Sequence, residues 1–408
     1  MSRVYNMTPR ERMIGAIKKE ETDRVPVAPD MSNMIPCRLT GLPFWDIYLH
    51  NKPDLYHAYL NTVGHFGIDG WFIYDFVRCQ PNSCLTSSHQ ILEQRPDRIL
   101  LKQTTSTPDG DLEGTMAYFR DNPPALQKGM VKDLKADFKK LCHLYSGVQS
   151  YDKEYFLQCK AEIGEKGLMG QYVATPGLQI LFSYFDGGIE QAIYAYEDYP
   201  ELIEELCYRM ERHETQRLEI MLDLGIDSVL MGGSGSITLQ SPSIWDKLSF
   251  PTIQKHAKMC REAGVLSGIH SCGKEMHIVE RCAKESDLDY INPLEIPPMG
   301  DSTLAQARAV AGTKLTLMGN LHTTETMLSS RETVRLESLR AIRDAGLDGA
   351  FILSTGDQCG RDTPDENIAE MLLAANTYGR YPIDIPALQA EIERLEQKCN
   401  SDQNEYYL

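Results

Sequence analysis

Residues 225–273 read GIDSVLMGGSGSITLQSPSIWDKLSFPTIQKHAKMCREAGVLSGIHSCG and contain two short apolar runs separated by a segment of helical length. The runs, residues 228–232 and 266–270, show no polar alternation, which is typical of parallel strands that are covered on both faces. Between them, Ser241 and Pro242 form a helix start signal and Gly264 a stop signal. The stretch therefore predicts one strand–helix–strand unit.

The same alternation of apolar runs and helical segments extends along the whole chain. Eight such units predict an α/β fold of the (β/α)₈ TIM-barrel type, with residues 1–408 as a single domain. A helix that begins at the capping box of Thr8 and Glu11 is an N-terminal extension, and residues 79–130 are an inserted hairpin or meander. An open doubly wound sheet is the alternative, but it usually carries a Gly-x-Gly-x-x-Gly turn, and none is present. The eight predicted strands are residues 24–29, 71–75, 168–173, 228–232, 266–270, 289–294, 315–319 and 350–354.

Composition excludes several classes of function. A net charge of −17 argues against nucleic-acid binding, which needs a basic face. No apolar run approaches the ~18 residues that a membrane helix needs, and the first residues form no apolar signal segment. The 11 cysteines are odd in number and irregularly spaced, which favours reduced thiols. We expect a cytoplasmic protein. The oligomeric state is left open, and a homodimer is one alternative.

Two potential metal ligands end the fifth predicted strand. Residues two apart on a strand face the same way, so His270 and Cys272 are expected to project together. Imidazole and thiolate suit a tetrahedral metal, with zinc as the default. The pair alone leaves open that it is a packed histidine beside an inert cysteine. A barrel brings the carboxyl ends of its strands together, so Cys359, after the eighth strand, is the candidate third ligand. Glu295 is the candidate fourth.

Other strand ends carry polar or soft side chains that face the same mouth. Asp75 and Glu295 are candidate acid–base residues, and the alternative is that they only hydrogen-bond loop amides. Asn320 and Met231 are candidate contacts to a bound cofactor. The alternatives are that Asn320 orders a turn and that Met231 fills the barrel mouth. His322 is a spare metal-ligand candidate.

Taken together, these motifs resemble the uroporphyrinogen decarboxylase superfamily over most of the chain. That superfamily has a (β/α)₈ barrel. The resemblance is carried by Thr8-Pro9-Arg10-Glu11-Arg12, Arg24-Val25-Pro26-Val27, Gly67-Ile68-Asp69, His270-Ser271-Cys272-Gly273, Asn292-Pro293-Leu294-Glu295, Gly319-Asn320, Ser354-Thr355-Gly356 and the segment from Cys359 to Asn367.

The superfamily holds two chemistries. Its decarboxylases carry an arginine-rich motif after the first strand, where this chain has Ala28-Pro29-Asp30-Met31-Ser32-Asn33-Met34, without arginine. Its zinc-dependent methyltransferases are similar to this chain in having His-x-Cys and one downstream cysteine, matching His270, Cys272 and Cys359. Here Asp357 and Gln358 separate that cysteine from Gly356.

The resemblance implies zinc-dependent methyl transfer between a small methylated substrate and the cobalt of a corrinoid. The expected substrate is a methoxylated aromatic, as in O-demethylation, and the corrinoid (cobalamin) is expected on a separate partner protein, because the chain has no Asp-x-His-x-x-Gly signature. Zinc would polarise the ether oxygen as a Lewis acid. The alternatives are methylcobalamin:thiol transfer of the coenzyme M kind, a metal-free decarboxylase-like tetrapyrrole enzyme, and a non-enzymatic ligand carrier.

Overall fold

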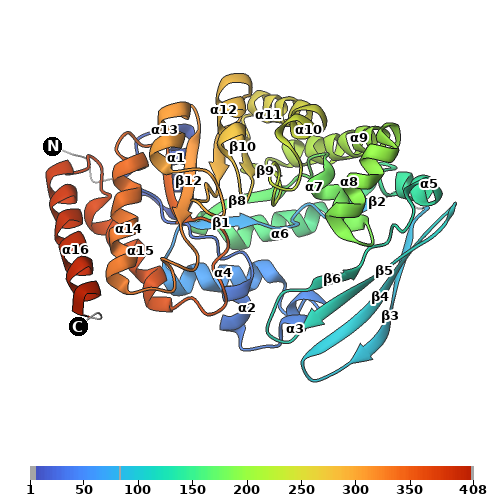
Figure 1. Ribbon diagram of the computed structural model, residues 1–408, viewed down its shortest axis with the longest axis horizontal. Coiled ribbons are helices and arrows are strands. Elements are labelled where there is room, and N and C mark those ends of the chain that lie inside the picture. The colour runs from blue at the N-terminus through green and yellow to red at the C-terminus, as the bar shows by residue number, and fades with distance from the viewer. Residues whose placement is uncertain (1–5, 82–83, 406–408) are drawn as a thin grey trace.

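A curled parallel sheet of seven strands forms the centre of the molecule (Figure 1). The computed structural model describes residues 6–81 and 84–405, so the predicted absence of a signal segment at residues 1–5 lies outside it. The observed strands match seven of the eight predicted runs closely, because each run is buried on both faces. In sheet order they are β1 (Gly70–Ile73), β8 (Gly167–Tyr172), β9 (Ser228–Gly232), β10 (Leu266–His270), β11 (Tyr290–Asn292), β12 (Thr316–Leu321) and β13 (Phe351–Thr355).

The first predicted strand, residues 24–29, lies between the two edges of this sheet. On one side, the Leu353 N–H donates to the Pro26 carbonyl at 2.9 Å, and the Ala28 N–H donates to the Leu353 carbonyl at 3.0 Å. On the other side, the Asp69 N–H donates to the Val27 carbonyl at 2.9 Å. Residues 24–29 thus form isolated bridges instead of a regular strand, but they occupy the predicted place. The α/β barrel prediction is confirmed.

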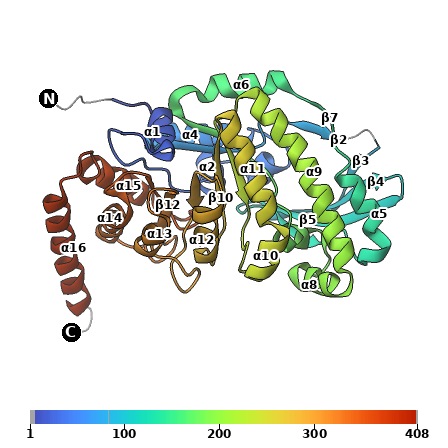
Figure 2. The same ribbon diagram turned by 90° about the horizontal axis from the view of Figure 1, so that it is seen from above.

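The helices surround the sheet and cover one of its ends. Figure 2 shows α9 to α15 arranged around the strands. Helix α1 packs Met13 and Ile17 against the barrel interior, so it covers the N-terminal end. No helix in the described part of the chain combines the length and apolarity that a membrane span requires. The helices are α1 (Pro9–Lys18), α2 (Met34–Thr40), α3 (Phe44–Tyr48), α4 (Leu55–Phe66), α5 (Leu134–Leu144), α6 (Lys153–Ile163), α7 (Leu178–Leu181), α8 (Gly188–Asp198), α9 (Pro200–Leu224), α10 (Pro242–Leu248), α11 (Phe250–Ala263), α12 (Met276–Glu285), α13 (Leu304–Ala311), α14 (Arg331–Ala341), α15 (Asp365–Tyr378) and α16 (Ile385–Glu405).

Alternate strand residues build two separate cores. Leu230, Leu266 and Met318 pack with Tyr290 inside the barrel. Their neighbours along the strands, such as Met231, pack with the outer helices in the larger core. Because side chains alternate along a strand, this pattern fixes which residues face the barrel axis at the opposite, C-terminal end. His270 shares the inward parity of Leu266 and therefore faces the axis.

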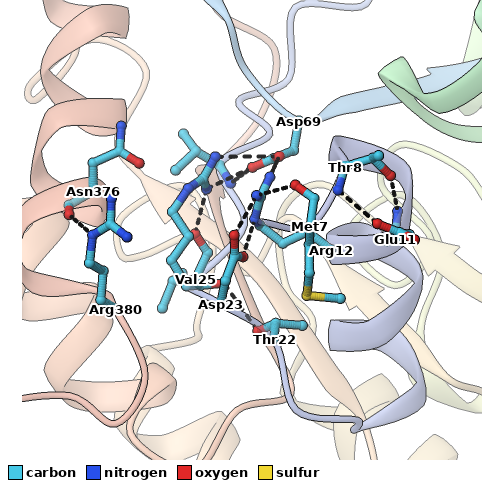
Figure 3. Close-up of polar contacts among 12 residues, drawn as sticks. Met7, Thr8, Glu11, Arg12, Thr22, Asp23, Val25, Asp69, Asn376 and Arg380 are labelled. Carbon is cyan, nitrogen blue, oxygen red and sulfur yellow. Dashed lines mark hydrogen bonds and ion pairs between the residues drawn. The ribbon is translucent and has the colours of Figure 1, made fainter. Parts of the chain in front are cut away.

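A buried ion network closes the N-terminal end of the barrel (Figure 3). Arg12 Nη1 donates to Asp69 Oδ1 at 2.5 Å, and Arg24 Nη1 donates to Asp69 Oδ2 at 2.8 Å. Arg12 also forms a bidentate pair with Asp23, at 2.6 and 2.8 Å. Asp69 is fully buried between two guanidinium groups, and its charge is therefore compensated. Three motifs that carried the family resemblance are thus structural and lie far from the C-terminal mouth.

Aspartates that precede strands repeat one hydrogen bond around this end. Asp69 accepts from the Val27 N–H at 2.8 Å, Asp227 from the Met169 N–H at 3.1 Å, and Asp289 from the Ser267 N–H at 2.9 Å. In each case the carboxylate precedes one strand and binds the backbone of the neighbouring chain segment. Such bonds fix the register of adjacent parallel strands, since a shifted strand would leave the carboxylate without its donor.

The insertion predicted at residues 79–130 is an antiparallel sheet beside the barrel. Its four strands run in the order β3-β4-β5-β6, so the predicted hairpin or meander is confirmed; residues 82 and 83 lie outside the described structure. A two-stranded ribbon joins it to the helices. The strands are β3 (Thr86–Gln94), β4 (Arg98–Thr107), β5 (Gly110–Phe119) and β6 (Ala125–Lys128), and the ribbon is β2 (Cys79–Pro81) with β7 (Val148–Tyr151).

Candidate metal centre

The carboxyl end of β10 places an imidazole beside a thiol. His270 is the last residue of the strand, and its Nε2 lies 3.0 Å from Sγ of Cys272. Sγ of Cys272 also lies 3.5 Å from Oγ of Ser234, in the loop after β9. The prediction that these two side chains project together from the end of this strand agrees with the geometry.

The third member of the group is Asp357. Ligand atoms of His270, Cys272 and Asp357 all lie within 4.8 Å of one another, and all three residues are half-buried. Asp357 belongs to the loop after β13, where the Thr355 hydroxyl donates to its carbonyl at 2.7 Å. Two loops that are 85 residues apart in sequence therefore meet at one point (357 − 272 = 85).

These three donors fit a zinc ion. Zinc takes imidazole nitrogen, thiolate sulfur and carboxylate oxygen at about 2.0–2.3 Å in tetrahedral geometry, which puts neighbouring ligand atoms roughly 3–4 Å apart. His270 Nε2 and Cys272 Sγ, 3.0 Å apart, are already within that range, and the Asp357 carboxylate, within 4.8 Å of both, lies close enough to reach the same ion. Three protein ligands also leave one coordination position for a substrate atom, which is the pattern of a catalytic metal site.

Asn292, at the end of β11, contacts the far side of the imidazole. Its amide nitrogen lies 3.2 Å from Nδ1 of His270, while its Oδ1 is buried without a partner among the described residues. Amide nitrogen and oxygen exchange places when the group is turned over, and the hydrogen-bond network decides between them. With the oxygen toward Nδ1–H, Asn292 gains its missing donor. Nε2 then carries the lone pair that a metal requires.

Cys359, the predicted third ligand, is not a member of this group. Its thiol is fully buried and lies 3.8 Å from Oγ1 of Thr355. Its backbone N–H donates to the carbonyl of Asp30 at 2.8 Å, which holds the loop against the segment after residues 24–29. Burial raises the pKa of the Cys359 thiol to about 12. The role of Cys359 as a ligand stays a prediction.

Glu295 lies next to the metal group. Its carboxylate accepts a hydrogen bond from the Gly273 N–H, immediately after Cys272. Burial raises the pKa of the Glu295 carboxyl, and the Gly273 N–H opposes that rise. The fully buried Glu275 accepts from the Leu294 N–H at 2.5 Å and so fixes the turn that carries Glu295. This position is compatible with both predicted roles, fourth ligand or acid–base group.

The other predicted site residues lie in different surroundings. Asp75 accepts from Nε2 of Gln171 at 2.8 Å and lies 3.9 Å from Nη2 of Arg217, outside the metal group. Asn320 donates to the carbonyl of Leu294 at 3.0 Å, which matches the turn-ordering alternative. Met231 is fully buried in the core between sheet and helices. Contacts of these three residues with a ligand stay predictions.

The sequence analysis missed two acidic residues at the mouth, Asp357 and Asp30. Asp30 follows residues 24–29, is buried, and accepts from the Ser32 N–H at 3.0 Å. Burial raises the pKa of the Asp30 carboxyl, and the nearby Asp357 adds to this rise. The strand-end rule that selected Asp75 and Glu295 applies equally to Asp30. Asp357 has no local signal of its own, because it stands in a loop two residues before a cysteine, which is the more usual zinc ligand.

Comparison with known proteins supports the superfamily. A family model for uroporphyrinogen decarboxylase (URO-D) matches residues 181–378, which include His270, Cys272, Glu295 and Asp357. No curated protein matches the sequence.

A solved structure agrees with the fold, and a second one shows a weaker likeness. A methyltransferase from Methanosarcina mazei is 15% identical with a TM-score of 0.62, and the match covers 91% of this chain and 99% of that one. A B12-independent methionine synthase from Shewanella sp. W3-18-1 is 12% identical, covering 93% and 99% of the two chains, with a TM-score of 0.46. At 15% identity, the likeness to the Methanosarcina mazei methyltransferase concerns the fold alone.

Proposed function

We propose that this chain is a zinc-dependent methyltransferase that moves a methyl group between a small substrate and the cobalt of a separate corrinoid protein. The observation that carries the proposal is the group formed by His270, Cys272 and Asp357 at the C-terminal end of the barrel. Active sites of this barrel type lie at that end, and the donor set suits zinc. The URO-D match and the fold shared with a methyltransferase support this choice of chemistry.

Each residue has a distinct part in the proposal. His270, Cys272 and Asp357 would hold the metal, with Glu295 as a fourth, displaceable ligand or as the acid–base group that gives a proton to a leaving phenolate or takes one from a thiol. Bound zinc would act as a Lewis acid toward an ether oxygen or a thiol. Asn292 fixes the imidazole tautomer. Asp75 and the cofactor contacts Asn320 and Met231 stay predictions.

The proposed methyl donor is a methoxylated aromatic, with a thiol of the coenzyme M kind as the alternative. In either case the cobalt has to reach the open mouth, so a corrinoid-binding protein is the proposed partner. The metal-free decarboxylase alternative is disfavoured by a specific observation. Where decarboxylases bind carboxylates with arginine, residues 28–34 contain no arginine, and the buried Asp30 in that segment offers no positive charge to a carboxylate.

Metal content tests the proposal directly. Purified protein, reconstituted with zinc, is compared with Cys272→Ala, Asp357→Asn and Cys359→Ala, and with Cys142→Ala on α5 as a half-buried cysteine control. We expect about one zinc per chain, lost in the first two variants and retained in the control. Absence of zinc after reconstitution would overturn the proposal. Loss of zinc in Cys359→Ala but not in Asp357→Asn would show that the third ligand is Cys359 and not Asp357.

Activity then identifies the substrate class. Methoxylated aromatics are incubated with the zinc protein and reduced cobalamin, and methylcobalamin formation is followed by its absorbance. We expect transfer with the zinc-loaded protein and none with Cys272→Ala. Transfer from methylcobalamin to a thiol, without reaction of any methoxylated aromatic, would favour the alternative.

A further inference from the structure

The inserted sheet presents an open edge, strand β3. The strand runs from Thr86 to Gln94 and is the terminal strand of its sheet, with β4 as its neighbour. All of its residues are exposed except the half-buried Glu93. Figure 1 shows β3 along the outer side of the sheet that projects from the barrel. Alternate backbone N–H and C=O groups of such a strand point away from the sheet and remain free to pair.

Strand β3 has little of the protection that proteins usually give to an edge. Natural edges are blocked by lysine, proline, bulges or short length. Residues 86–94 contain no lysine, arginine or proline. A bulge lies between Ile91 and Glu93, which leaves Thr86 to Ile91 as a regular run. The opposite edge, β6, has only four residues and ends in Lys128.

The edge also exposes two large aliphatic side chains and carries no uncompensated charge. Ile91 and Leu92 are 54% and 49% exposed, which is high for large aliphatic side chains. The one charged residue, Glu93, accepts hydrogen bonds from Arg98 at 3.1 and 3.2 Å, and its charge is therefore compensated within the sheet. The edge of β3 therefore adds no uncompensated charge to a chain of net charge −17.

From these observations we propose that β3 of one copy pairs antiparallel with β3 of a second copy, joining the two inserted sheets into one. Two chains that each carry −17 repel each other, and a neutral edge lets them meet without opposing like charges. A two-fold axis makes the contact isologous, so a strand of given length meets a strand of the same length. The β3 edges of the two copies are then both paired, so no further copy can add to them and the assembly stops at a dimer. This inference does not depend on the metal site.

Sedimentation of the full chain over a range of concentrations tests the proposal. The variant Ile91→Lys introduces a positive charge into the β3 edge, and the two-fold symmetry brings the same charge into the joined sheet from the second copy. Leu157→Lys on α6 is the matched control, since Leu157 is 50% exposed. We expect a monomer–dimer equilibrium, weakened at least about tenfold in Ile91→Lys and unchanged in Leu157→Lys. Circular dichroism of both variants should match that of the native chain.

Hydrogen exchange locates the contact. In a dimer of this kind, amides of residues 86–94 exchange more slowly at high than at low protein concentration, because half of them gain a partner in the second copy. A chain that stays monomeric would overturn the proposal. So would a dimer that Ile91→Lys leaves intact, a dimer without concentration-dependent protection of β3, or growth beyond two copies.

Discussion

The amide nitrogen of Asn292 lies 3.2 Å from Nδ1 of His270, so two neighbouring strands end in one hydrogen-bonded pair. Removing the amide leaves the imidazole free to turn and to change tautomer. For Asn292→Ala we expect zinc affinity to fall about 10- to 100-fold, the usual effect of losing a partner of a metal-bound histidine. Competition with a chromophoric chelator measures this.

Asn320→Ala is the control for that variant, because the Asn320 amide contacts the Leu294 carbonyl and not the imidazole. Equal zinc affinity of the Asn292 and Asn320 variants would contradict the role given to Asn292.

X-ray absorption at the zinc edge should count the sulfur ligands. Zinc–sulfur bonds are about 2.3 Å and zinc–nitrogen or zinc–oxygen bonds about 2.0–2.2 Å, so the two shells are separable. With His270, Cys272 and Asp357 as ligands we expect one sulfur per zinc. The spectrum of Cys359→Ala should then be the same as that of the native protein. A fit that needs two sulfurs would show that Cys359 binds the metal.

Asp69→Asn should destabilise the barrel strongly. The substitution takes the carboxylate away from the buried Arg24 and leaves Arg12 with Asp23 alone, and breaking a buried ion pair costs about 3–5 kcal/mol. Urea unfolding measures the change. Asp227→Asn is the control, because its partner Arg10 is partly exposed to water, and a smaller loss is expected there. Equal losses in both variants would mean that burial of the network adds nothing.

Stability should fall below neutral pH through His256. Burial lowers the pKa of this imidazole to about 4, and Lys255 adds to the shift. In the unfolded chain, His256 is therefore protonated below about pH 6.5. In the folded chain, the same imidazole becomes protonated only at about pH 4. Stability is complete above pH 6.5 and is lost as pH falls, by up to about 1.4 kcal/mol per pH unit.

His256→Asn should lose less stability than the native chain between pH 7 and pH 5, as measured by urea unfolding at each pH. His50→Asn, at an exposed position, serves as the control and should follow the native chain. Parallel behaviour of both variants would rule out His256 as the source of the effect.

The barrel was predictable because its strands are buried on both faces. Runs such as residues 228–232 and 266–270 carry the hydrophobic signal without interruption, and the structure has them at the same bounds. Strand β3 carries no such signal, because both of its faces are exposed and its apolar and polar residues do not alternate. Its strand conformation depends on backbone pairing with β4. The insertion was therefore predictable as a place but not as a four-stranded sheet.

The metal group was predictable in part for a similar reason. His270 and Cys272 share one strand end, where a spacing of two decides their direction. The identity of the third ligand depends on the conformation of the loop after β13. That conformation is set by contacts such as the hydrogen bond from the Thr355 hydroxyl to the Asp357 carbonyl, which no local sequence pattern predicts. A choice between Asp357 and Cys359 could not be made from spacing alone.

The carboxylates of Asp69, Asp227 and Asp289 hold neighbouring strands in register from the end opposite the mouth. The register of these strands therefore does not depend on the loops that carry Cys272, Glu295 and Asp357. Those loops are free to accumulate substitutions, and even an added sheet after β1, while the frame beneath them stays the same. Substitutions that change the substrate specificity of this barrel can therefore arise in the loops with little effect on the stability of the fold.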